Sequence, residues 1–578
     1  MREGTELHVR SFRAALSLAL AAGLGACTVG PDFEPPQADV PPSWSDAARN
    51  PSAAVSLQAD PDPRWWTSFN DPVLTSLVER TVAGNPDLQQ AVLRIVQARQ
   101  AEAAARGAGL PSLGGQGSYT RQQLGLRGIL KSRGAFDSVE GLRNNPQLNE
   151  QEPGLGNRVA DALGGALNGV TGPTNLFQLG FDSSWEFDLF GRVRRSVEQA
   201  NAQTQAAVEG TNDALVTLLA EVARTYAELR GAQALARTQQ QNVEAARELL
   251  QLTERRRRQG LTTELDVANQ RAQLASYEAQ LQPFLRQAQQ AMNRLSVLTG
   301  QPPGALDREL SVAAPIPPTP PSVPVGLPSS LARRRPDIRQ AEARLHAATA
   351  GVGVATAQFY PDISLTGSIG LRAVDADYLT NWASHFYSFG PSVSLPIFQG
   401  GRLTANLRLA RAQQAEAALA YRSTVLSALQ EVEDSLVAYR TDRTQQQLLQ
   451  RTVKAAETAL ALARDRYDNG LSSFLDVLDA QRSLVDARQQ LVRSTLSLTT
   501  DLVSLYKALG GGWQEGLVTS VVSIPPLEGG RPVESWSPDS LAGVDPPGRP
   551  VPTTAGVGPL QPSYPRPEPA RLPPAVRP

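Results

Sequence analysis

The stretch that organises this chain is Gly470-Leu471-Ser472-Ser473-Phe474-Leu475-Asp476-Val477, and the same pattern occurs earlier as Gly260-Leu261-Thr262-Thr263-Glu264-Leu265-Asp266-Val267. The two copies align without a gap from residues 252–281 against 462–491. A glycine followed by leucine and two hydroxyl residues predicts a helix end and a restart, because glycine adopts the left-handed conformation and Ser or Thr caps the next helix. Each copy therefore predicts the tip of a helical hairpin.

The repeat extends beyond the tips. Residues 85–113 match residues 335–363 without a gap, including a shared Pro-Asp pair at their start. Similarity over this length indicates an internal tandem duplication. The expected organisation is a signal peptide, an N-terminal extended arm, a first structural repeat, a Pro-rich connector, a second structural repeat and a Pro-rich disordered tail, at residues 1–26, 27–70, 71–310, 311–333, 334–515 and 516–578 respectively.

Composition excludes several classes of function. The 578 residues carry a net charge of −1, so bulk charge predicts no nucleic-acid partner. One Cys and three His leave no paired-Cys or HExxH metal site, and we expect no metal and no cofactor. No nucleophile elbow or Gly-rich phosphate loop is present, so an enzyme is not expected.

The N-terminus predicts export and a lipid anchor. Positive charges precede a short apolar run at 14–22, which is too short to span a membrane. The Leu-Gly-Ala-Cys sequence at 24–27 resembles a bacterial lipobox, in which Cys27 would become the lipidated first residue of the mature chain. Thr28 at the next position favours delivery to the outer membrane in that pattern. The alternative is a plain signal peptide with an incidental Cys.

Four segments change from the helical period to a period of two. Aromatic and aliphatic side chains alternate with polar ones over 177–189, 361–371 and 387–398, and 113–119 is a weaker fourth strand. Strands of about ten residues with one apolar face are typical of membrane barrels. Four strands cannot close a barrel, and lipid offers no partner to an open edge. We therefore expect the strands of three chains to be pooled.

Two long helices are predicted at 192–259 and 402–469, each roughly 100 Å long. Shorter helices are expected at 86–106 and 262–299. Apolar residues recur at threes and fours along the second long helix, as in a coiled-coil seam: Leu403, Leu407, Ala410, Ala417, Tyr421, Val425, Ala428, Val432, Leu436 and Tyr439. A single hairpin of this length leaves one face uncovered, which again favours an oligomeric tube.

The duplicated plan of strands and long helices, the Asn-Pro-Asp-Leu opening at 85–88, the tip motif at 470–484, the ending at 505–513 and the lipobox resemble the TolC-type outer-membrane efflux channels. Within that family the chain resembles the NodT/OprM-like lipoprotein subfamily, which partners resistance-nodulation-division pumps. The resemblance covers about residues 27–515.

The resemblance implies an α+β membrane protein that is a homotrimer. A twelve-stranded transmembrane β-barrel, with four strands per chain, would continue into a twelve-helix periplasmic barrel. The implied location is the outer membrane of a Gram-negative bacterium, with Cys27 anchored in outer-membrane lipid. The implied function is the passive exit channel of a tripartite efflux pump for drugs and other toxic small molecules. Its tip would dock onto a periplasmic adaptor (membrane fusion) protein and an inner-membrane pump through Gly260, Leu261, Gly470, Leu471, Ser472 and Ser473.

The resemblance also implies an iris-like gate at the periplasmic tip. Family members close the tip with rings of Asp, which correspond to Asp476 and Asp479, and with a Tyr-to-Asp link, which corresponds to Tyr467 and Asp266. The alternatives are that the two ring residues are solvated carboxylates near a helix N-terminus and that Tyr467 simply packs in the seam. Ser472 stands where some family members have a charged latch residue, so the chain departs from the family pattern there.

Other features leave alternatives open. The run of four Arg at 255–258 fits either a solvated helix C-terminus or a docking surface for the adaptor. Residues 122–175 are expected to form a long extracellular loop. A channel for metal ions or for type I protein secretion is an alternative function, and a structural coiled-coil lipoprotein is a more distant one.

Overall fold

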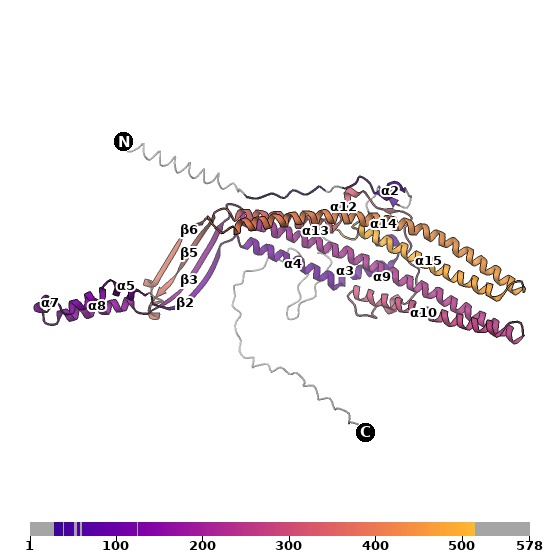
Figure 1. Cartoon of the computed structure of the whole chain (residues 1–578), viewed down its shortest axis with the longest axis horizontal. Coiled ribbons are helices and arrows are strands. Elements are labelled where there is room, and N and C mark those ends of the chain that lie inside the picture. The colour runs from indigo at the N-terminus through magenta and orange to yellow at the C-terminus, as the bar shows by residue number, and fades with distance from the viewer. Residues whose placement is uncertain (1–27, 38–39, 51–54, 58–60, 124, 515–578) are drawn as a thin grey trace, which may run out of the picture. The chain divides into compact units, whose positions relative to one another are not determined.

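The computed structural model describes residues 28–37, 40–50, 55–57, 61–123 and 125–514. The predicted signal peptide, the predicted lipidation site Cys27 and the Pro-rich tail lie outside these residues. The described part is mostly helical, with one four-stranded sheet and a two-stranded pairing (Figure 1).

Two helical hairpins of equal dimensions dominate the structure. The first joins α9 (Arg192–Arg258) to α10 (Glu264–Leu298), and the second joins α14 (Arg402–Asp468) to α15 (Phe474–Ala508). Both long helices have 67 residues and both return helices have 35. The two predicted hairpins are therefore confirmed, and the helix bounds expected from the sequence lie within two residues of those found.

The turns form as the glycine pattern predicts. Gly260 has a φ of 76° and Gly470 a φ of 74°. The next N–H in each copy reaches back across the turn: Leu261 N donates to Arg256 O at 2.9 Å, and Leu471 N donates to Arg466 O at 2.8 Å. These bonds are those of a Schellman motif, which satisfies the last helical carbonyls.

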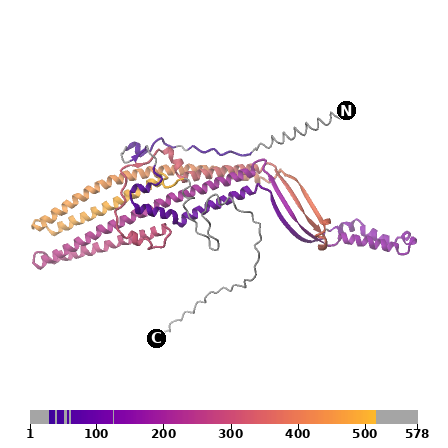
Figure 2. The ribbon, with the colours of Figure 1, turned by 180° about the vertical axis from the view of Figure 1, so that it is seen from behind.

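Shorter helices complete each long one. Helix α4 (Pro86–Gly107) and α10 follow one another along α9, while α13 (Pro336–Ala357) packs against both α9 and α14 (Figures 1 and 2). Asn85 caps α4 as predicted, since its Oδ1 accepts from Asp87 N and Leu88 N. Most of the predicted seam of α14 is buried, with Ala428 and Val432 fully covered.

All four predicted strands are present. They are β2 (Ser112–Gln122), β3 (Thr174–Phe187), β5 (Asp362–Ala373) and β6 (His385–Ser394). They pair antiparallel in the order β2-β3-β5-β6, so β2 and β6 are edges within the described chain. Large apolar side chains on this sheet are exposed, including Phe181 at 58% and Phe389 at 79%. A four-stranded sheet with open edges and an exposed apolar face is thus the state of the single chain.

The segment between β2 and β3 is helical. Its described residues form four helices, α5 (Leu126–Ser132), α6 (Ala135–Arg143), α7 (Pro146–Gln151) and α8 (Leu155–Thr171). Helices α6 and α8 pack together, and Arg143 Nη2 forms an ion pair of 2.6 Å with Asp161 Oδ1. The sequence predicts a long loop here, and these helices were not predicted because Gly-rich segments have low helical propensity.

A compact core surrounds the middle of the long helices. Helix α3 (Pro72–Gly84) and the 3₁₀ helix η1 (Trp65–Phe69) lie here, and the Trp65 ring stacks on Tyr506 with centroids 5.2 Å apart. The remaining elements are α2 (Ser45–Arg49), β1 (Val55–Ser56), α11 (Asp307–Leu310), β4 (Val323–Pro324), α12 (Pro328–Arg334), η2 (Ala376–Tyr378) and η3 (Trp382–Ser384).

The N-terminal arm joins this core. Strand β1 pairs parallel to β4, and the buried Trp44 donates its Nε1–H to Gly326 O at 2.9 Å. The arm is therefore tied to the Pro-rich connector rather than free along its length. No described helix contains an apolar window long enough to cross a membrane.

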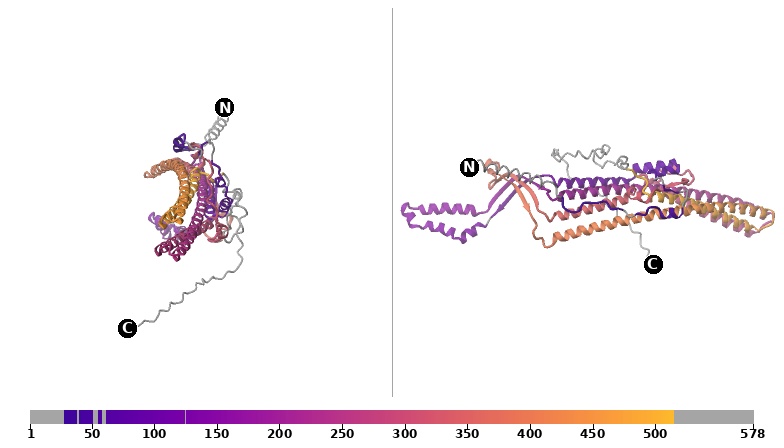
Figure 3. Two further views of the ribbon diagram at one scale, coloured as in Figure 1. Left: turned by 90° about the vertical axis from the view of Figure 1, so that its right-hand side faces the viewer. Right: turned by 90° about the horizontal axis from the view of Figure 1, so that it is seen from above.

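Viewed along their length, the helices follow an arc (Figure 3, left). The second long helix leaves several leucines exposed on its flanks, namely Leu409, Leu419, Leu426, Leu448 and Leu462. Full burial of one such side chain is worth about 1.5–3 kcal/mol. These positions are therefore sites where a further protein surface would add stability.

Gly300 and Gly260 form a matched pair for testing the end of α10. Both have positive φ, 74° and 76°, so alanine at either adds strain of about 1–2 kcal/mol. A Cβ at Gly300 would also overlap the carbonyl oxygen of Gly84, whereas a Cβ at Gly260 meets no described atom within 4 Å. We expect Gly300→Ala to lower the melting temperature at least ~2 °C more than Gly260→Ala does. Thermal unfolding monitored by circular dichroism measures both values. Equal shifts would contradict a tight contact between α3 and α10.

Candidate functional site at the hairpin tips

The acidic residues of the two tips have equivalent local roles. Asp266 and Asp476 each occupy the third position of their helix and form a capping box with the N-cap residue. Asp266 Oδ2 accepts from the backbone N–H of Thr263 at 3.0 Å, and Asp476 Oδ2 accepts from that of Ser473 at 2.9 Å. The hydroxyl residues of the repeated motif therefore cap the helices as predicted, and the acids complete the cap.

Asp266 is held firmly in the charged form. The Thr262 hydroxyl donates to its Oδ2 at 2.6 Å, and the Thr263 hydroxyl donates at 2.8 Å. These hydrogen bonds, led by that of Thr262, lower the pKa of Asp266 below its ordinary value and outweigh its slight burial. Within the described part of the chain no hydrogen bond joins Asp266 to Tyr467, so the implied link between them stays a prediction.

Asp476 and Asp479 both lie on the exposed face of α15. The two residues between them, Val477 and Leu478, are buried, whereas Leu475 beside Asp476 is exposed. The side chain of Asp479 is 78% exposed and lies 4.0 Å from Arg482. The two carboxylates therefore share one open helix face, where they are available to a pore or to solvent.

Tyr467 lies between the two hairpins. Its ring is 5.5 Å from that of Phe474, and it packs on the buried cluster of Leu460, Val477 and Leu484. On the other side, the guanidinium of Arg256 lies over the Tyr467 ring at 4.6 Å from its centroid. Because Arg256 belongs to α9 and Tyr467 to α14, this cation–π contact joins the first hairpin to the second.

The four arginines of the 255–258 run have different environments. Arg255, Arg257 and Arg258 are exposed, and Arg257 forms an ion pair with Glu264 across its own turn. Arg256 is half-buried against Tyr467. In the sequence the four arginines form one uniform run, and only the packing distinguishes their environments.

A cavity of about 270 Å³ separates the return helices near the tips. It lies between α10 and α15 and is lined by residues that include Gln273 and Asp479. Arg482 spans it, donating from Nη2 to Gln273 Oε1 at 2.9 Å. The tips are therefore joined by a few polar and cation–π contacts rather than by a continuous apolar core.

Each tip also carries an exposed apolar residue. Leu261 is 70% exposed and Leu471 is 69% exposed, directly after the two turn glycines. The Ser472 hydroxyl has no hydrogen-bond partner in the part of the chain described. Leu261 and Leu471 therefore occupy equivalent positions at the two hairpin tips, where they form an exposed apolar surface.

Two adjacent carboxyls were not anticipated from the sequence. Asp442 of α14 and Asp501 of α15 share a hydrogen bond, and burial followed by the neighbouring Asp442 raises the pKa of Asp501 to about 7. A signal existed, because Asp442 follows Tyr439 at seam spacing and so places a charge on an apolar stripe.

Comparison with known families identifies the fold. The family model described as outer membrane efflux protein matches residues 77–301 and 327–511. The chain belongs to the outer membrane efflux protein family. As a member of this family it is a transport channel rather than an enzyme, and it forms the outer-membrane exit of an efflux pump in a Gram-negative bacterium.

Relatives support this assignment over nearly their full lengths. The chain is 34% identical over 511 residues to the outer membrane protein OprJ of Pseudomonas aeruginosa, covering 86% of this chain and 96% of OprJ. It is 33% identical over 503 residues to the probable efflux pump outer membrane protein TtgC of Pseudomonas putida, with coverage of 86% and 96%.

Solved structures show the same architecture. The outer-membrane channel OprN superposes with a TM-score of 0.72 at 33% identity, covering 84% of this chain and all of OprN. The open state of the MtrE outer membrane channel of Neisseria gonorrhoeae superposes with a TM-score of 0.67 at 28% identity, covering 84% and 98%. The family resemblance predicted from the sequence is confirmed, and the structural coiled-coil alternative is wrong.

The Asp501 pair predicts a pH-dependent stability of this efflux protein. The pKa of Asp501 is about 7 in the folded chain against an ordinary 3.8, so the folded state binds the proton more tightly. Protonated Asp501 therefore stabilises the folded protein fully below about pH 4, and this contribution is lost as pH rises through about 7. Asp501→Asn, which cannot ionise, should therefore raise the melting temperature at about pH 8 and change it less at about pH 5. Asp479→Asn is the control, and a gain that is equal at both pH values would contradict the assignment.

Proposed function

We propose that this efflux protein functions as a homotrimer in which three four-stranded sheets form one twelve-stranded barrel. The supporting observation is the open sheet with edge strands β2 and β6 and an exposed apolar face. Outer-membrane barrels have at least eight strands, and lipid cannot satisfy the polar groups of an open edge. One chain therefore supplies a third of a barrel that closes in the membrane.

The helices fit the same proposal. Their arc and the exposed leucines of α14 suit a ring of hairpins, in which each α14 flank is covered by a neighbouring chain (Figure 3). Three chains would provide twelve helical columns continuous with the barrel and projecting into the periplasm. In this arrangement the equal lengths of the two hairpins place all six tips at one level. We attribute these lengths to tandem duplication of 71–310 and 334–515.

The tips are the proposed docking surface for a periplasmic adaptor protein, which connects the channel to an inner-membrane resistance-nodulation-division pump. Gly260 and Gly470 set the turns, and the exposed Leu261 and Leu471 offer apolar contacts to the partner. Ser472 and Ser473 complete the second tip. The pump supplies the energy and selects the cargo, so the cargo is proposed only as small toxic molecules. Metal ions and secreted proteins remain the alternatives.

The proposed gate lies at the same tips. Around a threefold axis, Asp476 and Asp479 would form two acidic rings that favour cations in a narrow pore. Tyr467 would lock the closed state through Arg256 within its own chain, and through Asp266 if the helices approach further. Opening would then move the second hairpin away from the first, as an iris.

The anchor, the insert and the tail would lie at different sides of the outer membrane. Cys27 would be lipidated and anchored in outer-membrane lipid at the periplasmic side. Helices α5 to α8 leave the sheet from the ends of β2 and β3 that lie opposite α4 and α9, so they would lie outside the cell. The Pro-rich tail beyond residue 515 would then lie in the periplasm.

The deciding experiment measures the mass of the purified, detergent-solubilised protein and its current in a planar bilayer. A trimer with a small, cation-selective and mostly closed conductance supports the channel assembly. A monomer or dimer that gives no current would contradict the pooled barrel.

Neutralising the acidic rings tests the gate. Asp476→Asn combined with Asp479→Asn removes both charges, while the amide oxygen at position 476 can still accept from Ser473 N–H and retain the cap. We expect cation selectivity to fall and block by multivalent cations to weaken, because the rings would no longer concentrate cations in the pore. Asp434→Asn, an exposed carboxylate of α14 distant from the tips, is the control. Unchanged selectivity and block would show that these residues are solvated carboxylates outside the pore.

Removing the contact between the hairpins tests the lock. Because an exposed cation–π contact is worth about 0.5–1 kcal/mol, Arg256→Ala should raise the open probability by roughly two- to fivefold. Arg255→Ala removes an adjacent exposed arginine and should leave the open probability unchanged. Single-channel recording without adaptor separates gating from docking. Equal effects of the two variants would favour a general charge effect over a specific lock.

A further inference from the structure

The first turns of α9 contain a guanidinium that is almost fully covered. The Arg195 side chain is 4% exposed, although it lies near the N-terminus of the helix, where the helix dipole disfavours a cation. Burial of an unpaired charge is costly, so the position requires acceptors from elsewhere in the chain.

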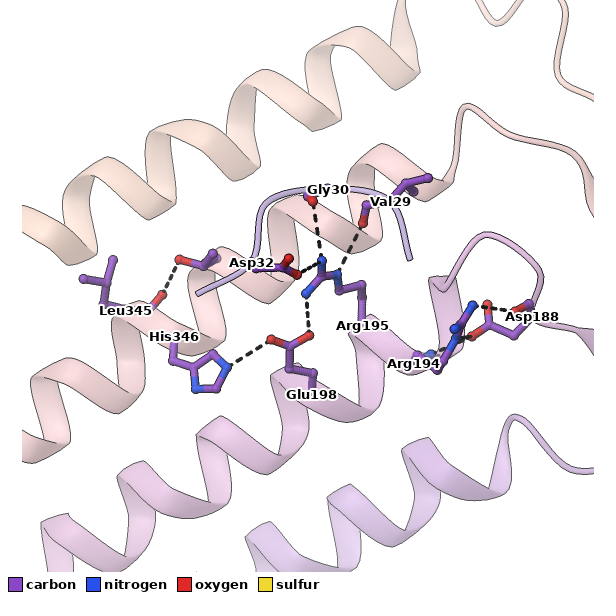
Figure 4. Close-up of polar contacts among 10 residues, drawn as sticks. Val29, Gly30, Asp32, Asp188, Arg194, Arg195, Glu198, Leu345 and His346 are labelled. Carbon is purple, nitrogen blue, oxygen red and sulfur yellow. Dashed lines mark hydrogen bonds and ion pairs between the residues drawn. The ribbon is translucent and has the colours of Figure 1, made fainter. Parts of the chain in front are cut away.

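Three of its acceptors come from the residues that directly follow Cys27 (Figure 4). Arg195 Nε donates to the carbonyl of Val29 at 3.3 Å. Its Nη2 donates to the carbonyl of Gly30 at 3.4 Å and to Asp32 Oδ1 at 2.6 Å. Its Nη1 donates to Glu198 Oε2 at 2.8 Å. The guanidinium therefore binds the arm by its backbone as well as by a side chain.

Glycines from three separate segments make room for this contact. Gly30 has a φ of 97°, and a Cβ there would lie 2.5 Å from the Cα of Gly353 on α13. A Cβ at Gly353 would in turn lie 2.8 Å from the Arg195 side chain. At Gly191, with a φ of 82°, a Cβ would lie 2.6 Å from the Thr28 side chain. The arm thus lies against the helices at backbone distance.

The contact continues on both sides of Arg195. Before it, Val29 N donates to the carbonyl of Phe190, in the link between β3 and α9, at 3.2 Å. After it, the Phe33 ring stacks on His346 of α13, with centroids 4.3 Å apart and planes at 11°. His346 Nε2 lies 3.0 Å from Glu198 Oε1, so Glu198 contacts both Arg195 and His346. Residues 28–34 are held at several points rather than by one bond.

We propose that Arg195 is a clamp that fixes the arm at the junction of sheet and helices, and so determines where the lipid chains on Cys27 enter the membrane. The inference rests on the proposed lipidation and barrel. Cys27 precedes Val29 by two residues, which reach at most ~7 Å. The lipid would therefore enter the inner leaflet beside the periplasmic end of β3. Arg195 acts here as a positioning residue.

A fixed anchor differs physically from a loose tether. A loose lipid only keeps the chain near the membrane, whereas a lipid held beside β3 also orients the open sheet toward the bilayer in which its edges must pair. The clamp would thus couple the anchor to insertion and trimer assembly.

Proteolysis of the full-length protein in detergent tests the clamp. Chymotrypsin cleaves after Phe33 only when the arm is released, because native segments must open locally before cutting. With rates normalised to the unfolded chain, we expect about threefold faster cleavage for Asp32→Asn, the loss of one exposed ion pair. Arg195→Met should accelerate cleavage after Phe33 about tenfold or more, because it removes all the hydrogen bonds of the guanidinium. Asp32 is 88% exposed, so its variant keeps the fold even if Arg195→Met does not.

The matched control is Arg335→Met. Arg335 is also buried, with a side chain that is 9% exposed, and it also binds two carboxylates, Asp337 and Glu431, and one carbonyl. It lies at the opposite end of α13 from Gly353, and its hydrogen bonds and ion pairs go to Asp337, Glu431 and Ala508 rather than to the described residues 28–37. Cleavage at Phe33 should therefore stay at the wild-type rate. Wild-type rates in both Asp32→Asn and Arg195→Met, or equal acceleration by Arg335→Met, would overturn the clamp.

A double-variant comparison tests the link to the lipid. The fraction of heat-modifiable trimer in outer membranes would be measured for wild type, Cys27→Ser, Asp32→Asn, Arg195→Met and each clamp variant combined with Cys27→Ser. We expect both clamp variants to lower the fraction, and to lower it no further once Cys27 is replaced. An additional loss in the combined variants would show that the clamp residues act on folding alone and would overturn the role in positioning the lipid.

The two proposals fail differently. If the wild-type protein forms no trimer and carries no current, the proposed channel assembly fails, while cleavage at Phe33 still reports whether Arg195 holds the arm. If the wild-type protein conducts and the arm is cut equally fast in all variants, the channel stands and the clamp fails.

Discussion

The open edges of the four-stranded sheet are the constraint on which the rest of this structure depends. Strands β2 and β6 each present a row of backbone groups that no described strand of the chain pairs. The sheet face that carries Phe181 and Phe389 is exposed as well. Lipid tolerates the apolar face but not the unpaired edges, so the sheet is stable in a membrane only when other chains close it. The helices show the same incompleteness in the exposed leucines of α14.

Corresponding helices of the two repeats have equal lengths, so the position of the sheet also determines the positions of the two tips. Helices α4 and α13 have 22 residues each, as the long helices have 67 and the return helices 35. One added residue would advance a helix by about 1.5 Å and rotate its tip by about 100°. The matched lengths therefore keep the acid of each capping box in an equivalent place. At the middle, Trp65 and Tyr506 join the arm to the last helix and stabilise this register.

Much of the fold follows from local patterns. The turns at Gly260 and Gly470, the cap at Asn85 and the alternation in β3 depend on a few consecutive residues, and each was predicted correctly. The second repeat shows where the pattern misleads. At the position of Asn85 it has Arg335, which makes no N-cap bond and instead donates to the carbonyl of Ala508. The helices of the 122–175 insert were not predicted from the sequence, because Gly-rich segments carry little local signal for a helix.

The sequence by itself determined the duplicated hairpins, the four strands, the family and the residues that form the tips, because these depend on period, spacing and turn chemistry within short segments. Only the tertiary structure decided which partner each charged side chain has. Arg195 binds Gly30, 165 positions away, and Arg256 lies on a tyrosine of the other hairpin. Burial and the neighbouring Asp442 raise the pKa of Asp501. The energy of a buried charge depends on groups brought together by packing, and neither the spacing nor the type of the residues reveals them in advance.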